Sequence, residues 1–215
     1  MAREARSGGA SAAWSLSLLS ALSALPCLVL PTGARAADPD WPCAQRLVPR
    51  LSAATLWAAP LPAADAGGRA NPAIADIVAA VTPRDMEMEQ GEAKLAAFAD
   101  ALPAPDRRER LAETFAALLE ATNEERGAVI ARIEALARRQ RELGNIVAKV
   151  TDELRAIPPD AAGADAARRA EILDRRTLLI RSIDETQRTM RYACEVPTQL
   201  DARLGRYARL LQSKL

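Results

Sequence analysis

The sequence predicts an all-α fold: a long, coiled-coil-like antiparallel helical hairpin with two short helices packed at its base, resembling a four-helix bundle. Three observations predict it. Strong helix formers dominate the composition, and aromatic residues make up only 3% of the 215 residues. Apolar residues recur alternately every three and four positions over two long stretches. A short turn with prolines and a glycine separates these stretches, so they should pack antiparallel.

Residues 1–36 have the features of a secretory signal peptide. Arg3 and Arg6 precede an apolar run at 13–30, and Ala34 and Ala36 supply small residues before a cleavage site. We therefore expect cleavage between Ala36 and Ala37, a periplasmic location, and no transmembrane segment in the mature chain.

Two alternatives to cleavage at this position follow from the same run. About 18 apolar residues are just enough to span a bilayer, but serines and a proline interrupt them. A lipoprotein would be modified at Cys27, but Pro26 replaces the small residue expected before such a cysteine.

Removal of the signal peptide would leave Cys43 and Cys194. Two cysteines in an oxidising compartment usually pair, so we expect a disulfide between them. The alternative is a redox-active thiol pair, but such cysteines usually lie close together in sequence, as in C-x-x-C.

Prolines and glycines divide the mature chain into an irregular N-terminal segment, 37–70, and a helical domain, 71–215. Asn71 and Pro72 favour a helix start, which predicts a helix over 72–81. Thr82 with Asp85 resembles a capping box for a helix over 83–102, as does Asp106 with Glu109 for the next. Two long helices, 106–157 and 165–213, should complete the domain.

The two long helices carry the apolar seams. Gly127 and Gly144 lie off the seam, so we expect a continuous first helix, with folding back at either glycine as the alternative. Pro197 must kink or interrupt the second helix. The register places Cys194 level with about residue 128, so the disulfide would attach the N-terminal segment halfway along the hairpin. This predicts a four-helix base, 72–128 plus 190–215, and a two-helix arm, 129–189.

The seam residues of the arm are the candidate partner-binding residues, because a long helical surface suits protein recognition. They could face a partner protein or a second copy of the chain. These residues are Ile133, Leu136, Leu143, Val147, Ile172, Leu179 and Ile183.

Few residues suggest chemistry. The chain lacks histidine, the commonest general base, and its 29 basic and 28 acidic residues nearly balance, which argues against nucleic-acid binding. An acidic cluster could bind a cation, but acidic residues in a first helical turn also complement the helix dipole. We expect no metal, cofactor or catalytic residue. The acidic cluster comprises Asp85, Glu87, Glu89 and Glu92.

Polar seam residues and surface arginines have two interpretations each. Arg126 and Gln140 could set register or partner choice, while Arg126 and Arg176 could extend outward to solvent. Arginines at 138–141, 168–169 and 175–176 could bind an anionic partner, but interleaved acidic residues favour an internally paired surface. Trp41 and Tyr192 lie close in sequence to the two cysteines, so we expect them to pack over the disulfide; a peptide- or glycan-binding platform is the alternative.

Two segments carry a resemblance. Residues 40–49, continuing to Trp57, and residues 192–197 resemble segments of a group of uncharacterised secreted alphaproteobacterial proteins. The resemblance implies a paired Cys43 and Cys194 and a periplasmic setting, and it brings no activity.

These features together predict a non-enzymatic periplasmic interaction or scaffold protein, with a protein as partner. The alternatives are a periplasmic chaperone or envelope-stress binding protein, and an accessory subunit of an envelope transport complex.

Overall fold

The computed structural model of the protein describes residues 40–58, 61 and 71–215, all within the unit Ala37–Leu215. In these ranges the fold is all-α, with one 3-10 turn and no strand, which confirms the predicted class. The predicted signal peptide, Cys27 and the cleavage site between Ala36 and Ala37 lie outside the described residues. The elements are η1 (Ala53–Thr55), α1 (Pro72–Val81), α2 (Met88–Ala101), α3 (Arg107–Arg155) and α4 (Ala164–Gln212).

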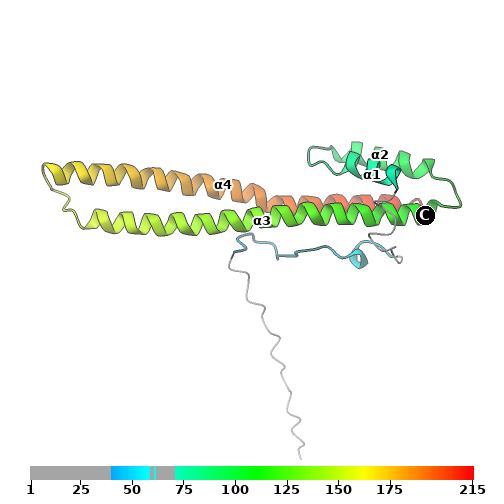
Figure 1. Cartoon of the computed structure of the whole chain (residues 1–215), viewed down its shortest axis with the longest axis horizontal. Coiled ribbons are helices and arrows are strands. Elements are labelled where there is room, and N and C mark those ends of the chain that lie inside the picture. Colours follow the sequence, from blue (N-terminus) through cyan, green and yellow to red (C-terminus); the bar gives the residue numbers. More distant parts are fainter. Residues whose placement is uncertain (1–39, 59–60, 62–70) are drawn as a thin grey trace, which may run out of the picture. The chain divides into compact units, whose positions relative to one another are not determined.

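Helices α3 and α4 form the predicted antiparallel hairpin (Figure 1). Arg176 Nε on α4 donates to Thr151 Oγ1 on α3 at 3.2 Å, and Arg126 Nη1 on α3 donates to the carbonyl oxygen of Pro197 at 2.8 Å. Residue numbers thus fall along one helix as they rise along the other. Gly163 precedes α4 with φ of +59°, a backbone conformation that suits glycine because it has no Cβ.

Both long helices are continuous across the residues that could have broken them. Gly127 and Gly144 lie within α3, and a Cβ at either position would meet nothing within 4 Å. The alternative of folding back at a glycine is therefore wrong. Pro197 lies inside α4, and the helix changes direction in the part coloured orange to red (Figure 1), as the missing amide hydrogen requires.

The base is a four-helix arrangement around one hydrophobic core. Both α1 and α2 pack on the hairpin, and Trp57 stacks on Phe115 with ring centroids 4.6 Å apart. Phe115 of α3 and Tyr207 of α4 are both buried in this core, as the predicted register requires. The core cluster comprises Trp57, Val81, Leu95, Ala99, Leu111, Phe115, Leu118, Leu204, Tyr207, Ala208 and Leu211.

The helix starts differ from two of the predictions. Asn71 caps α1 as expected, because its Oδ1 accepts from the Ala73 amide at 3.1 Å. Helix α2, however, begins at Met88 and not at residue 83. The hydroxyl of Thr82 donates to the Val78 carbonyl oxygen of α1 at 2.8 Å, so it belongs to the end of that helix. Asp106 makes no side-chain cap hydrogen bond to α3, so the second capping box is also wrong.

Candidate functional site

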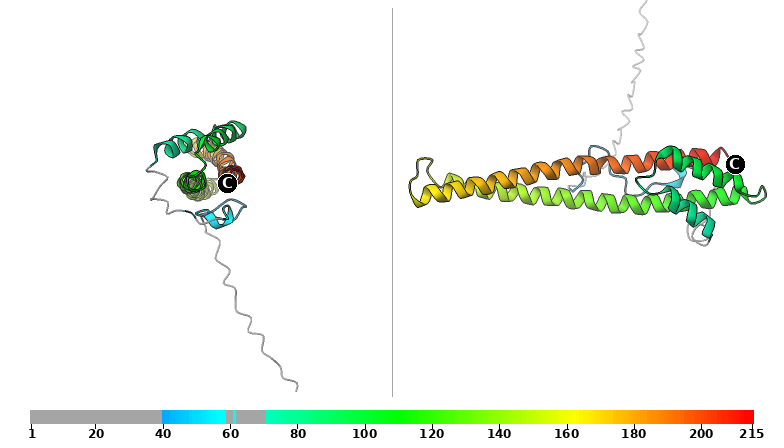
Figure 2. Two further views of the ribbon diagram at one scale, coloured as in Figure 1. Left: turned by 90° about the vertical axis from the view of Figure 1, so that its right-hand side faces the viewer. Right: turned by 90° about the horizontal axis from the view of Figure 1, so that it is seen from above.

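Residues 40–58 form an extended segment, here called the strap, that lies along the hairpin. The left view of Figure 2 shows α1 and α2 on one side of the α3–α4 pair and the strap, in blue, on the other. The disulfide between Cys43 and Cys194 joins the strap to α4, with the two Cα atoms 5.6 Å apart. The predicted pairing is therefore present, and it lies near the middle of α3 and α4.

Residues 51–58, the C-terminal part of the strap, are attached to the base largely through their backbone. Asn123, a buried residue of α3, accepts from the Leu51 amide at 2.8 Å and donates to the Leu51 carbonyl oxygen at 3.2 Å. Gln212 Nε2 donates to the Leu56 carbonyl oxygen at 2.9 Å, and Trp57 is buried in the core. These contacts join residues far apart in sequence.

The N-terminal end of the strap, at Asp40, is attached to the arm. Asp40 accepts hydrogen bonds from Arg138, at 2.8 Å, and from Arg141. The hydrogen bond from Arg138 is the largest cause that holds the pKa of the Asp40 carboxyl below its usual value. The strap thus contacts both the base and the beginning of the arm.

Arg126 is a buried, charged side chain of α3, at the junction of the base and the arm. Only 2% of its surface is exposed. Its guanidinium donates to the carbonyl oxygens of Pro197, at 2.8 Å, and Val48, at 2.7 Å, and to the carboxylate of Asp201. The interpretation that Arg126 extends outward is therefore wrong, because the strap covers it and supplies an acceptor.

The bend in α4 lies at the same level. Pro197 has no amide hydrogen, so the carbonyl of Ala193, four residues earlier, lacks its helical donor. Gln45 of the strap donates to the neighbouring Cys194 carbonyl oxygen, and Arg126 donates to that of Pro197. A cavity of about 90 Å³ adjoins this point. Its lining comprises Trp41, Gln45, Arg46, Leu47, Val48, Arg126, Ile130, Pro197, Thr198 and Asp201.

Asp201 is partly exposed at the edge of this cavity. Burial raises the pKa of its carboxyl, and the positive charge of Arg126 opposes that shift. The Asp201 carboxylate supplies a negative charge to the buried guanidinium of Arg126, which would be costly to bury without one.

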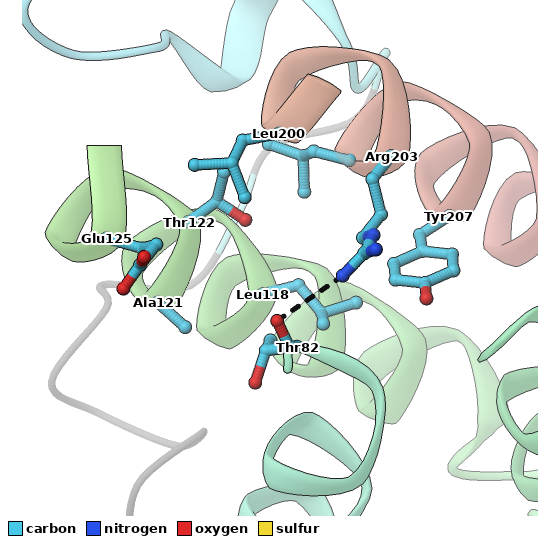
Figure 3. A pocket seen from close by; sticks show the side chains of 9 residues that line it. Thr82, Leu118, Ala121, Thr122, Glu125, Leu200, Arg203 and Tyr207 are labelled. Atoms are coloured by element: carbon cyan, nitrogen blue, oxygen red, sulfur yellow. Dashed lines mark hydrogen bonds between the residues drawn. The ribbon is translucent and has the colours of Figure 1, made fainter. Parts of the chain in front are cut away.

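A second cavity, of about 20 Å³, lies between the α1–α2 turn and the hairpin (Figure 3). Arg203 donates to the carbonyl oxygens of Pro83, at 2.6 Å, Arg84, at 3.2 Å, and Met86, at 3.0 Å. The Tyr207 hydroxyl donates to the Val81 carbonyl oxygen at 3.1 Å. These polar groups satisfy the end of α1 and the turn after it, so they act in folding.

The acidic cluster does not converge on a common point. Glu92 forms a two-point ion pair with Arg206, at 2.7 and 2.6 Å, and Glu89 lies 3.6 Å from the same guanidinium. Asp85 and Glu87 precede α2 and so are not in its first turn. In the described ranges, no group of three acidic, cysteine or histidine residues is placed to hold a metal ion.

Two of the seven candidate partner-binding residues of the arm lie inside the hairpin. Ile133 and Ile172 are buried, so they hold α3 and α4 together and are not open to a partner, which corrects the prediction. The seam turns inward because each helix buries its apolar stripe against the other. Five others are half-buried: Leu136, Leu143, Val147, Leu179 and Ile183.

The most exposed large apolar residues of the arm lie off the seam and were not among the predicted partner-binding residues. Leu178 is 63% exposed, Leu173 39% and Ile146 37%. The sequence alone could have identified these exposed residues, since an apolar residue outside both seam rows of a two-helix arm has no partner helix to cover it.

The surface arginines and aromatic residues divide between the two interpretations. Arg175 pairs with Glu153 at 2.9 Å and Arg176 with Thr151, which fits an internally paired surface. Trp41 is half-buried and donates to the Gln45 carbonyl oxygen at 2.7 Å. Tyr192 is 74% exposed, so the prediction that it packs over the disulfide is wrong.

Comparisons with protein-family models, with curated proteins and with solved structures gave no match for this chain. The resemblance noted from the sequence therefore stays a prediction. In the part of the chain that the structure describes, no helix is long and apolar enough to cross a membrane.

Proposed function

We propose that this protein is a non-enzymatic periplasmic interaction or scaffold protein whose arm binds a protein partner. The observation that carries the proposal is the outer part of the arm. The yellow and orange ends of α3 and α4 extend beyond α1, α2 and the strap (Figure 1), and Asp40 of the strap pairs with Arg138 and Arg141, close to the root of the arm.

The surface of the arm supports a protein partner. Ile146, Leu173 and Leu178 are exposed there among charged residues. Protein interfaces commonly combine a few apolar anchors with a polar rim, and a helix face presents such anchors at fixed spacing. The sequence supports the compartment, through the signal peptide features and a cysteine pair suited to an oxidising environment.

The experiment places a photoreactive amino acid at Leu178, and separately at Ile146, in cells that produce the full chain. The matched control position is Ala97, which is exposed on α2 at the base. We expect a discrete crosslinked product from the arm positions and none from Ala97. The double change Leu173→Glu and Leu178→Glu should remove the product, whereas Ala97→Glu should not.

Three outcomes decide between versions of the proposal. A product of twice the chain's mass identifies a second copy as the partner, which light scattering would check. A continuous ladder of products would favour the chaperone alternative. Equal products from Ala97 and Leu178 would contradict an arm-specific surface.

A further inference from the structure

We propose that the strap holds a hinge at the root of the arm, and that the Cys43–Cys194 disulfide controls this hinge. The redox state of the disulfide would then set how freely the arm moves relative to the base. The inference goes beyond the proposed function, because it concerns the protein without any partner.

The hinge is defined by two weak points at one level of the hairpin. Pro197 interrupts the hydrogen bonding of α4, and Gly127 of α3 is an exposed glycine, a poor helix former, where an added Cβ would meet nothing within 4 Å. Arg126, the neighbour of Gly127, donates to the Pro197 carbonyl oxygen, so Gly127 and Pro197 lie at the same level of the hairpin. A bend here would move the arm with little disturbance of the core, whose α3 members are Leu111, Phe115 and Leu118.

The strap crosses the hinge and is attached on both sides of it. On the base side, Leu51 is bound to Asn123, and Trp57 is buried against Phe115. On the arm side, Asp40 pairs with Arg138 and Arg141. A segment fixed at both ends of a bend resists the bend, and residues 40–50 are the part that spans it.

At the hinge itself the strap is attached to α4 mainly through the disulfide. Gln45 and Val48 add hydrogen bonds beside it, to the Cys194 carbonyl oxygen and from Arg126. The Asp40 ion pairs join arginines that are about half exposed, and such surface pairs contribute little. Loss of the disulfide should therefore release residues 40–50 while residues 51–58 stay attached.

The chemical step is thiol–disulfide exchange with a dithiol reductant. The dithiol supplies two electrons and two protons, its own sulfurs form a disulfide, and Cys43 and Cys194 become thiols. Both cysteines are only partly buried.

The test is hydrogen exchange of the purified protein, measured by mass spectrometry at short labelling times, with and without dithiothreitol. We expect the peptide covering 193–201, whose amides lie in α4, to exchange at least tenfold faster after reduction. Peptides from the core, 111–118 and 204–211, should stay protected over the same times. Cys194→Ser should reproduce the reduced pattern without any reductant.

A second variant separates the hinge from a general loosening. Pro197→Ala restores the missing helix donor, so residues 193–201 should stay protected after reduction. Unchanged exchange at 193–201 after reduction of the wild-type protein would overturn the proposal. So would equal acceleration in the core, which would mean that the disulfide holds the whole fold, or an identical response of Pro197→Ala at 193–201.

Discussion

At the residue scale, Arg126 decides how the strap and the hairpin fit together. Its position in an apolar seam suggested a side chain that escapes to solvent, as arginines often do. The structure buries it, because Val48 and Pro197 offer carbonyl acceptors and Asp201 offers a negative charge. Those partners lie more than 70 residues away along the chain, so no local pattern could have indicated them.

Replacing Arg126 with Met should destabilise the protein by about 2–3 kcal/mol, because two carbonyl groups would lose their donor. Urea unfolding followed by circular dichroism would measure the change. Arg132→Met is the matched control, since Arg132 is exposed on the same helix, and its effect should stay within about 0.5 kcal/mol. Equal effects of the two substitutions would contradict a structural role for Arg126.

Tyr207 gives a prediction about pH. Burial raises the pKa of its phenol, and the nearby Arg203 opposes the shift in part. The folded state therefore favours the neutral phenol, which also donates to the Val81 carbonyl oxygen. The resulting stability is present below the unfolded pKa, about 10, and is lost as the pH rises through the folded pKa.

The variant Tyr192→Phe makes this shift measurable, because it leaves Tyr207 as the only tyrosine. Near-ultraviolet absorbance of tyrosinate should show a higher titration midpoint in the folded protein than in the urea-unfolded chain. Coincident midpoints would show that the phenol is not buried in solution.

At the scale of elements, the long helices were predictable and the beginning of α2 was not. The apolar seams placed both ends of α3 and α4 within two residues, because a sustained period over many turns outweighs local ambiguity. The turn before α2 depends on Arg203, which donates to three of its carbonyl oxygens from the far end of the chain. Tertiary contacts of this kind replaced the capping box expected at Thr82.

Two glycines in helices should respond in opposite ways to replacement by alanine. A Cβ at Gly91 of α2 would lie 2.0 Å from the Tyr207 hydroxyl oxygen, whereas one at Gly144 of α3 would meet nothing within 4 Å. Gly91→Ala should therefore cost roughly 1–3 kcal/mol through overpacking, and Gly144→Ala should stabilise by up to about 1 kcal/mol. Thermal unfolding would compare them, and a stabilising Gly91→Ala would refute the close packing of α2 on α4.

At the scale of the whole domain, the sequence predicted the hairpin, the base, the arm and the cysteine pair. It did not predict the strap's path or which residues the arm exposes. Two of the seam residues expected to bind a partner, Ile133 and Ile172, are instead buried between α3 and α4. A repeating apolar pattern identifies the buried stripe of a helix, but not whether another part of the same chain or a partner covers it.

The arm also connects the proposed function to the fold. Its two helices bury their apolar stripes against each other, so their outer surfaces stay exposed. The base and the strap set where the arm begins, through Asn123, Arg126 and the disulfide. An exposed surface held on a fixed support suits the recognition role that we propose.

Helices α3 and α4 are each continuous, so the arm extends away from the base. Double electron–electron resonance between spin labels attached through unnatural amino acids at Lys94 and Lys149, both exposed, tests it most directly. Lys94 of α2 lies beside Leu95, which shares a core cluster with Phe115 of α3. From that level to Lys149, α3 runs for roughly 34 residues at about 1.5 Å each, so we expect a main distance of about 50 Å. A main distance below about 30 Å, a little over half the extent expected from the helical rise, would mean that the arm folds back on the base and would contradict the account.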